Sequence, residues 1–196
     1  MIAGSKATAK MKIERVNIED AKELLSIYAP YVRDTAVSFE YEVPSLSEFQ
    51  KRILNISSRL PYIKATKDNE IIGYAYANTF KDRKAYERSV EVTVYVRNDS
   101  RRSGVGRLLY SALEESLRRI GVLNMNACIA VARRNDRHLC NDSYRFHKKM
   151  GFSTVGRFHN SGYKFDTWYD MIWMEKIIGE HTKFPKDVNF GEWTIG

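Results

Sequence analysis

Between residues 89 and 96 the chain alternates strictly, with valine at each even position and polar or aromatic residues, Glu91 among them, at the odd positions. A period of two predicts a β-strand with one apolar face. The apolar spacing then changes to three and four from Val105 to Ile120, and Gly121 follows. We therefore expect a strand over 89–96 that leads into an amphipathic helix over 105–120, ended by glycine.

The same two periods predict the other elements of the chain. Pro30 falls near the end of the first helix, residues 67–70 indicate a hairpin turn, and Gly73 indicates a bulge or a close approach. The resulting order, β-α-α-β-β-β-α-β-α-β-β, is typical of a single mixed α/β domain. Further strands are expected over 11–16, 62–66, 71–78, 124–132, 154–159 and 168–176, and further helices from about residue 19, from Ser45 and over 142–149.

The composition is that of an ordinary globular protein. The chain has 196 residues, of which 43% are hydrophobic and 29% charged, and no apolar run approaches the ~20 residues that cross a bilayer. The N-terminus lacks the apolar core and cleavage site of a signal peptide, so we expect a soluble, cytoplasmic protein without a membrane partner. Cys128 and Cys140 are expected as free thiols, and no paired Cys-x-x-Cys or His-x-x-x-His spacing predicts a metal site.

The formal net charge of +8 favours an anionic partner, which could be nucleic acid, a membrane surface or an acidic small molecule. The basic residues are spread in short groups, and none forms the long tract of a nucleic-acid-binding tail. They either form a solvated surface or, at some positions, bind the phosphates of a nucleotide-like cofactor.

The segment Arg101-Arg102-Ser103-Gly104-Val105-Gly106 joins the predicted strand to the predicted helix. Glycines at the start of a helix leave its backbone N–H groups open to an anion, and Arg101, Arg102 and Arg107 would add positive charge. The segment fails both the dinucleotide fingerprint and the Walker pattern, so a different pyrophosphate-binding loop is needed. Taken alone, a Gly-x-Gly would more often be a solvated surface turn.

Several segments together resemble the GNAT acetyltransferase superfamily. The Arg-x-x-Gly-x-Gly run at 101–106 is similar to its acetyl-CoA pyrophosphate loop, and 146–152 resembles the end of its last helix. Within the superfamily, roughly residues 11–178 resemble the phosphinothricin acetyltransferase-like branch. The segments that carry this narrower resemblance are 35–39, 73–77, 81–86, 91–96, His147, 162–165 and 168–170.

The resemblance implies the GNAT fold, an α/β domain with a mixed central sheet, splayed middle strands and flanking helices. It also implies acetyl-CoA as co-substrate, with the backbone near Val94 and Ala130 exposed to the pantetheine arm. Because the link over 133–141 is longer than usual, Asn135 and Asn141 compete for the pantetheine contact, and we favour Asn141. The residues expected to bind the cofactor are Val94, Tyr95, Val96, Arg101, Arg102, Ser103, Gly104, Val105, Gly106, Arg107, Asn141 and Ser143.

Acetyl transfer to an amine needs a base, because an aliphatic amine resembles lysine, with a pKa near ~10.4, and arrives protonated. The resemblance assigns that catalytic role to Glu91, which projects from the face opposite the valines. Taken alone, it would be an exposed strand carboxylate. His147 stands where the branch has a histidine, and we expect it to donate a proton to the departing thiolate or to relay one. The alternative is a half-buried histidine that only orients its neighbours.

The loop before this strand matches the segment of the branch that receives the anionic groups of the acceptor. We expect Lys81, Arg83 and Tyr86 to bind the substrate, with Phe39 and Trp168 as pocket walls, because arginine grips a carboxylate or phosphinate bidentately. The predicted function is N-acetylation of a small anionic, amino-acid-like amine, of the phosphinothricin or methionine sulfone or sulfoximine type, by direct attack in a ternary complex. The alternatives are a polyamine, a protein N-terminus or a protein lysine as acceptor, and a non-catalytic module that binds acyl-CoA or nucleic acid.

Three segments are expected along the chain. Residues 1–10 are a flexible N-terminal segment or an expression remnant, 11–178 form the acetyltransferase domain, and 179–196 form a C-terminal extension without a counterpart in the family. The extension contains Phe190, Trp193 and Ile195, which indicates packing on a partner subunit or over a site, with a disordered end as an equal alternative. A homodimer without nucleic acid is expected.

Overall fold

A seven-stranded mixed sheet forms the centre of the molecule, in the order β1-β2-β3-β4-β5-β7-β6. The computed structural model describes residues 10–134 and 136–195, so Asn135 and nearly all of the predicted segment 1–10 lie outside the described residues. The strands are β1 (Lys12–Arg15), β2 (Tyr62–Lys67), β3 (Glu70–Thr79), β4 (Ser89–Val96), β5 (Asn124–Val131), β6 (Ser153–Lys164) and β7 (Thr167–Ile177). The helices are α1 (Ala21–Asp34), α2 (Leu46–Ser57), α3 (Val105–Arg119) and α4 (Asp142–Lys149), with single 3-10 turns at Ile18–Asp20, Lys84–Tyr86 and Asn98–Ser100. The predicted order and α/β class are confirmed.

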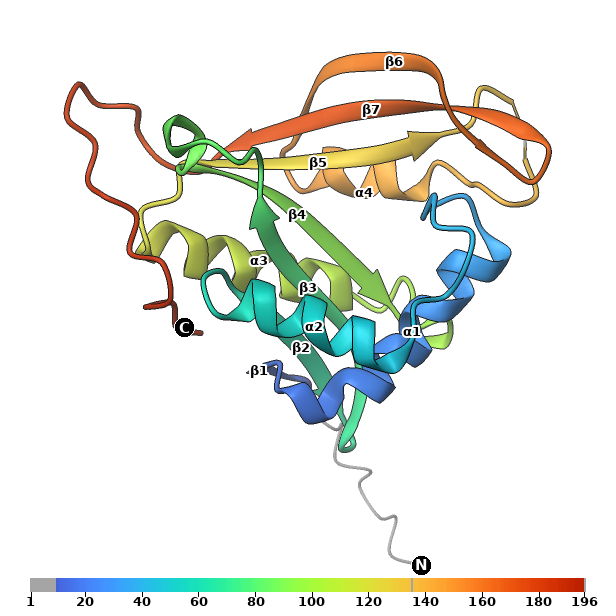
Figure 1. The fold of residues 1–196 in the computed structure, drawn as a ribbon, viewed down its shortest axis with the longest axis horizontal. Coiled ribbons are helices and arrows are strands. Elements are labelled where there is room, and N and C mark those ends of the chain that lie inside the picture. The colour runs from blue at the N-terminus through green and yellow to red at the C-terminus, as the bar shows by residue number, and fades with distance from the viewer. Residues whose placement is uncertain (1–9, 135, 196) are drawn as a thin grey trace, which may run out of the picture.

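The strands β4 and β5 separate in the middle of the sheet. They are parallel neighbours, but they pair only between residues 89–91 and 124–126. Beyond Glu91, β4 continues to Val96 and β5 to Val131 without further pairing to each other. Figure 1 shows the two strands diverging from their common end at the left. We call the space between residues 92–96 and 127–131 the wedge, and it confirms the splayed middle strands that the resemblance implied.

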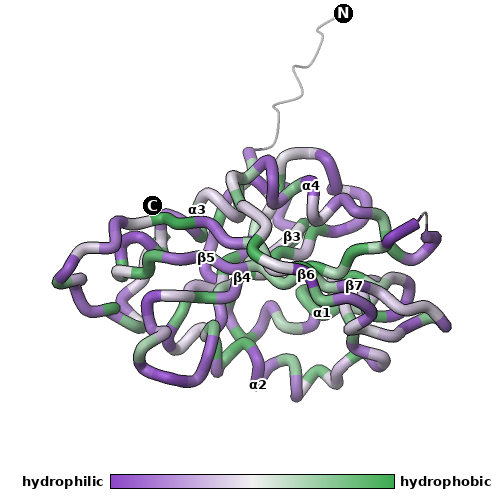
Figure 2. The backbone as a smooth tube through the Cα atoms, turned by 90° about the horizontal axis from the view of Figure 1, so that it is seen from above, coloured by the Kyte–Doolittle hydropathy of each residue, from purple (hydrophilic) through white to green (hydrophobic). Residues whose placement is uncertain are grey.

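Alternation along β4 divides the interior into two cores. Val90 and Val92 are buried on the face covered by α3 and α4, where Leu109 of α3 packs against them. The opposite face lies under α1 and α2 (Figure 1) and is rich in tyrosine, including the buried Tyr62 and Tyr74. In Figure 2 the hydrophilic parts of the chain gather in the peripheral loops, while hydrophobic stretches run through the interior.

Two hairpins turn through pairs of residues with positive φ. Asp68 and Asn69 have φ of 53° and 65°, and Phe165 and Asp166 have φ of 50° and 55°. Such pairs match two-residue turns between antiparallel strands. The first hairpin confirms the turn predicted at 67–70. At Gly73 the predicted close approach is also confirmed, because a Cβ atom there would lie 2.9 Å from the Tyr95 carbonyl oxygen.

The last two strands are longer than the predicted 154–159 and 168–176. The register of β6 on β7 shifts between Phe158 and Gly162, where Asp170 Oδ1 accepts the N–H of Asn160 at 2.9 Å. A side chain of β7 thus replaces a missing bond of the ladder, and β6 continues through a segment that lacks the alternation of a strand.

The first helix also continues beyond Pro30, to Asp34. Tyr31 and Val32 are buried on the far side of the proline. Their burial outweighs the single backbone hydrogen bond that the proline removes.

The C-terminal extension packs on its own domain. Trp193 is only 1% exposed and belongs to the core around α3, and the Arg15 guanidinium lies 3.8 Å from its ring centre. Ser116 Oγ donates to the Thr194 carbonyl at 2.8 Å, and the Asn189 N–H donates to the Ile120 carbonyl at 2.9 Å. The extension therefore completes the core of the same chain. No helix among the described residues is long and apolar enough to cross a membrane.

Candidate active site

The glycine loop between β4 and α3 presents backbone N–H groups at a helix N-terminus. Gly104 has a φ of +90°, and a side chain there would meet no atom within 4 Å. Gly106 is tighter, because a Cβ atom would lie 3.3 Å from the Phe146 ring. The first N–H groups of α3 have no acceptor within the helix. They can therefore bind an anion in the open space beside Gly104.

Three arginines surround this loop. Nη2 of Arg102 lies 3.4 Å from Oδ2 of Asp142, at the start of α4. The Arg101 guanidinium lies 4.9 Å from the centre of the Tyr31 ring. Arg107 is exposed on α3. Together with the open backbone at Gly104, these charges fit the diphosphate of a nucleotide cofactor.

The edge of β4 that faces the wedge carries backbone groups suited to an extended ligand. Because the Arg97 N–H donates to the Ile72 carbonyl in β3, alternation turns the N–H and C=O of Val94 and Val96 away from β3. The Tyr31 hydroxyl accepts from the Val96 N–H at 3.3 Å and donates to its carbonyl at 2.6 Å. The N–H and C=O of Val94, which were among the backbone groups predicted to contact the pantetheine arm, therefore remain facing the wedge.

The other predicted cofactor residues already have partners within the protein. The Asn141 side chain accepts from the Ala132 N–H at 3.1 Å and donates to its carbonyl at 3.2 Å, which ties the end of β5 to the start of α4. Ser143 Oγ lies 3.5 Å from Nδ1 of His147. The Tyr95 ring packs edge-on against Tyr31, with 4.9 Å between centroids. The roles of Asn141, Ser143 and Tyr95 in binding a cofactor stay predictions.

Glu91 lies where the wedge begins. It is opposite Asn78 in β3 and Asn126 in β5, in the last residue pair before β4 and β5 part. Its side chain is half-buried. Burial raises the pKa of Glu91 above its ordinary value of 4.5, and the nearby Lys81 ammonium partly opposes that shift. A carboxylate with a raised pKa is a stronger base, so this position favours proton transfer from an amine.

The loop between β3 and β4 brings Lys81 close to Glu91. Lys81 Nζ lies 5.2 Å from the centre of the Phe80 ring and 5.7 Å from that of Trp173 on β7. Phe80 also meets Trp173 and Tyr86 edge-on, at 5.5 and 6.0 Å between centroids. Aromatic rings thus hold a lysine ammonium beside the carboxylate.

The remaining predicted substrate residues are spread more widely. Arg83 lines a surface cavity of about 360 Å³, and Phe190 of the C-terminal extension forms part of its wall. Phe39 is half-buried, and its ring lies 6.2 Å from that of Tyr169. Trp168 is 59% exposed near the turn between β6 and β7. Trp168 and Trp173 are an odd number of residues apart along β7. Because side chains alternate along a strand, the two rings face opposite sides of the sheet.

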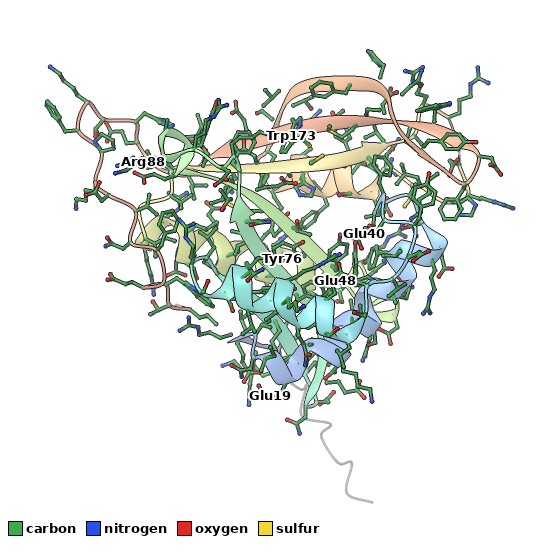
Figure 3. All side chains as sticks on the ribbon, viewed as in Figure 1. Glu19, Glu40, Glu48, Tyr76, Arg88 and Trp173 are labelled. Atoms are coloured by element: carbon green, nitrogen blue, oxygen red, sulfur yellow. The ribbon has the colours of Figure 1, made fainter. Side chains whose placement is uncertain are left out.

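Trp168 is therefore not brought to Glu91, and Trp173 takes the place beside Lys81. Tyr76 was also missed by sequence analysis. It lies opposite Thr93, two residues from the pair of Asn78 and Glu91, and so on the same face of the sheet. In Figure 3, Tyr76 lies in the middle of the view, just above α2, and Trp173 lies in the upper part, at the level of β5 and β7. Both residues follow from the period of two once strand pairing is known, but the chain alone does not specify that pairing.

His147 is held inside the protein by hydrogen bonds at both ring nitrogens. It is 4% exposed, and its Nδ1 lies 2.8 Å from the Ser143 carbonyl and its Nε2 2.9 Å from the Tyr110 hydroxyl. Since a carbonyl only accepts, Nδ1 carries the proton and Nε2 accepts from Tyr110. Burial lowers the pKa of His147 to about 4, so the imidazole is neutral at pH 7. This geometry favours the orienting alternative over a direct proton donor.

The buried histidine makes the protein sensitive to acid. Because the pKa of His147 falls from an ordinary 6.5 to about 4 on folding, the unfolded chain binds its proton first as the pH falls below 6.5, and stability is lost. We expect a loss of about 2 kcal/mol between pH 7 and pH 5 from this residue. Urea unfolding of wild type and His147→Gln at both pH values measures it. An equal loss in the two proteins would contradict the assignment.

Comparison with known proteins identifies the class to which this site belongs. Residues 13–173 match the family model described as Acetyltransferase (GNAT) domain. The chain therefore belongs to the GNAT acetyltransferases, and it is an acyltransferase that uses acetyl-CoA. Within residues 10–134 and 136–195, no group of three or more His, Cys, Asp or Glu side chains could hold a metal ion.

The relatives identify the branch within this family. The phosphinothricin N-acetyltransferase of Streptomyces coelicolor is 32% identical over 175 residues, which cover 87% of this chain and 98% of the relative. The L-methionine sulfoximine/L-methionine sulfone acetyltransferase of Pseudomonas aeruginosa is 27% identical over 83% of this chain and 92% of its own. A solved structure of a phosphinothricin acetyltransferase from Sinorhizobium meliloti in complex with AcCoA has a TM-score of 0.83 and 28% identity, and covers 95% of this chain and 98% of that one. The chain is thus of the phosphinothricin acetyltransferase type, as predicted.

Proposed function

We propose that the enzyme acetylates the amino group of a small anionic, amino-acid-like substrate, of the phosphinothricin or methionine sulfone or sulfoximine type, by direct attack in a ternary complex. The observation that carries this proposal is the Lys81 ammonium, which is close enough to Glu91 to lower the pKa of that carboxyl. An anionic group bound by Lys81 and Arg83 would hold the neighbouring amine near Glu91. The names of the relatives support this acceptor class.

The proposed chemistry uses one base and one backbone donor. Acetyl-CoA supplies the acetyl group as a thioester, whose carbonyl carbon is attacked by the amine nitrogen. The C–S bond then breaks, and CoA leaves as a thiolate that becomes the free thiol with the second proton that the nitrogen releases. Glu91 takes the proton that the ammonium must lose before its nitrogen can attack. The N–H of Val94, which faces the wedge, is the group we expect to polarise the acetyl carbonyl.

For His147 we propose a positioning role through Tyr110. Burial raises the pKa of the Tyr110 hydroxyl, so this hydroxyl keeps its proton and donates it in a hydrogen bond to the imidazole. By accepting its proton, His147 Nε2 fixes the direction of the hydroxyl. Replacement of His147 by asparagine or glutamine, which can accept the same hydrogen bond from Tyr110, should therefore preserve most of the activity.

The acceptor class is tested by comparing amino acids with their uncharged amides in wild type and Arg83→Ala. We expect wild type to release thiol from acetyl-CoA with phosphinothricin or methionine sulfone, and the variant to raise the KM for the amino acid by roughly tenfold, because it loses one charge-assisted contact. Affinity for acetyl-CoA should not change.

Lys84→Ala is the matched control, because Lys84 carries the same charge and lines the same cavity. An equal rise in KM for this variant would indicate a general positive potential instead of a specific contact. If wild type prefers the amide, a polyamine or a protein lysine, the anionic acceptor is wrong and the acetyltransferase assignment survives.

We also propose a cytoplasmic homodimer. Phe158 and Trp168 are 56% and 59% exposed on the hairpin of β6 and β7, and large exposed apolar side chains support an interface between copies. Sedimentation of the purified protein tests the dimer.

A further inference from the structure

Asn126 of β5 reaches across to β4 at the closed end of the wedge. Its Nδ2 donates to the Val90 carbonyl at 3.1 Å. Glu91 and Asn126 form the last residue pair of the parallel ladder, and beyond them the two strands separate (Figure 1). A side chain thus bridges the strands at the point where their backbone pairing stops.

The hydrogen bond to Val90 decides which end of the Asn126 amide is free. A carbonyl oxygen only accepts, so the NH2 group of the amide faces it and the amide oxygen points elsewhere. No residue that the structure describes donates to Asn126 Oδ1. In the same part of the chain, the side-chain atoms that are covered and unpaired belong to Glu40 and Trp193. Asn126 Oδ1 is therefore open to solvent, although the residue as a whole is only 9% exposed.

The Asn126 side chain leaves the sheet on the same face as that of Glu91. Paired residues of neighbouring strands point to the same side, and such strands lie ~4.8 Å apart, so the two side chains are direct neighbours. Cys128 lies on this face too, two residues further along β5. Burial raises the pKa of its thiol, and the Glu91 carboxylate adds to that rise. This face of β5 therefore borders the carboxylate.

A second asparagine flanks Glu91 on the opposite side, but it presents the other end of its amide. Asn78 of β3 is paired with Glu91, and its Oδ1 accepts the Thr79 N–H at 2.8 Å. Its NH2 group, which only donates, is the end left free, whereas Asn126 leaves an oxygen, which only accepts. A ligand N–H beside Glu91 thus finds its acceptor on the β5 side.

The amine of an amino-acid acceptor needs such an oxygen. It arrives as an ammonium group with three N–H donors, of which one proton passes to Glu91 in the proposed function. The remaining N–H groups lose their hydration in the wedge unless another acceptor replaces the water, and the Lys81 ammonium nearby only donates. An amide oxygen can accept an N–H there without taking the proton, since an amide does not titrate near neutral pH.

We propose that Asn126 Oδ1 accepts an N–H of the ammonium group of the acceptor and holds its nitrogen beside Glu91. This inference rests on the proposed function. In this arrangement Lys81 and Arg83 bind the anionic group, Asn126 binds the amine, and Glu91 receives the proton. Because Nδ2 is already bonded to Val90, the oxygen is fixed in place before the acceptor binds, which lowers the entropic cost of binding. Asn126 thereby distinguishes an amino acid from the acid without an amino group.

Asn126→Ala and Asn126→Asp separate this role from a purely structural one. Alanine removes the oxygen, whereas aspartate keeps an oxygen acceptor but has no N–H for the Val90 carbonyl. Steady-state kinetics use whichever of phosphinothricin and L-methionine sulfone wild type acetylates. Asn126→Ala should raise the KM for that acceptor by roughly ten- to a hundredfold, and Asn126→Asp should stay within about threefold of wild type. If Asn126 only joined β4 to β5, aspartate would be at least as damaging as alanine.

Asn78→Ala is the matched control, because Asn78 also neighbours Glu91 but offers no free oxygen to the amine. Its KM for the acceptor should be close to that of wild type. The analogue without the amino group, 4-(methylsulfonyl)butanoate for methionine sulfone, should inhibit wild type and Asn126→Ala equally, since it has no N–H for Oδ1. Affinity for acetyl-CoA should not change in any variant.

Four results would each overturn the role of Asn126. They are an unchanged KM in Asn126→Ala, an equal rise in Asn126→Asp, an equal rise in Asn78→Ala, and weaker binding of the analogue to Asn126→Ala than to wild type. If wild type acetylates neither amino acid, the proposed function fails, and the Asn126 variants are then compared with the primary amine that wild type does acetylate.

Discussion

Replacement of Glu91 by glutamine lowers the turnover number by roughly one to four powers of ten, because the amide cannot take the proton of the acceptor. The affinity for acetyl-CoA should stay close to that of wild type, since Glu91 lies at the closed end of the wedge and the glycine loop at its open end. Steady-state kinetics at neutral pH and calorimetry with acetyl-CoA measure the two quantities separately.

The pH dependence adds a second signature. Burial raises the pKa of Glu91 above 4.5, so the acid limb of the wild-type rate profile should lie above that value. The loss in Glu91→Gln should shrink at high pH, where the amine arrives already neutral. Glu175→Gln is a suitable control, because Glu175 on β7 neighbours Asn126 on the same face. Normal turnover of the Glu91 variant at neutral pH would remove Glu91 from the chemistry.

Replacement of Gly104 by valine abolishes measurable binding of acetyl-CoA, with a fall in affinity of at least about a hundredfold, or ~3 kcal/mol. A Cβ atom at Gly104 meets no protein atom within 4 Å, so the new side chain occupies the open space beside the helix N-terminus, where we expect the pyrophosphate. Gly106 gives a less direct test, because its substitution also strains the contact with Phe146.

The control for Gly104→Val must reproduce its backbone strain, since a φ of +90° is unfavourable for any residue with a side chain. Gly151 has a φ of +89°, and its Cβ would meet only the flexible end of Lys176 at 3.5 Å or more. Gly151→Val should therefore lose similar stability and keep its affinity for acetyl-CoA. Calorimetry and thermal unfolding of both variants decide the matter. Equal affinities in the two would place the cofactor elsewhere.

The elements with strong periodicity could be predicted from the sequence. The strand over 89–96 and the helix after it have apolar residues at spacings that only one structure buries. The position of the glycine loop at the start of the helix indicated open N–H groups, but its interpretation as a pyrophosphate-binding loop came from the resemblance to the family. The same alternation placed Glu91 on the face without valines, whereas its catalytic role was inferred from the resemblance to the family.

Other parts of the fold and of the site depend on contacts between distant segments. The hydrogen bond between Arg52 and Glu40 joins α2 to the loop before it, and Lys164 reaches that loop from β6; no local pattern specifies either contact. Trp168 was predicted as a pocket wall and Trp173 was not, because the choice depends on the register of β7 against β5. For the C-terminal extension, the sequence offered only its aromatic composition. The burial of Trp193 depends on its contacts with the core around α3, which no local pattern specifies.

The parting of β4 and β5 also fixes a length. From Glu91 to Val96 the extended chain spans about 17 Å, at some 3.3 Å for each residue, and the glycine loop follows five residues later. A donor anchored by its phosphates at the loop must reach back across this span before its acyl carbon meets the carboxylate. We therefore expect the enzyme to select its acetyl donor by the length of the arm as well as by charge. A thioester without the nucleotide could enter the wedge but would have no anchor, and one with a shortened arm would bind without reacting.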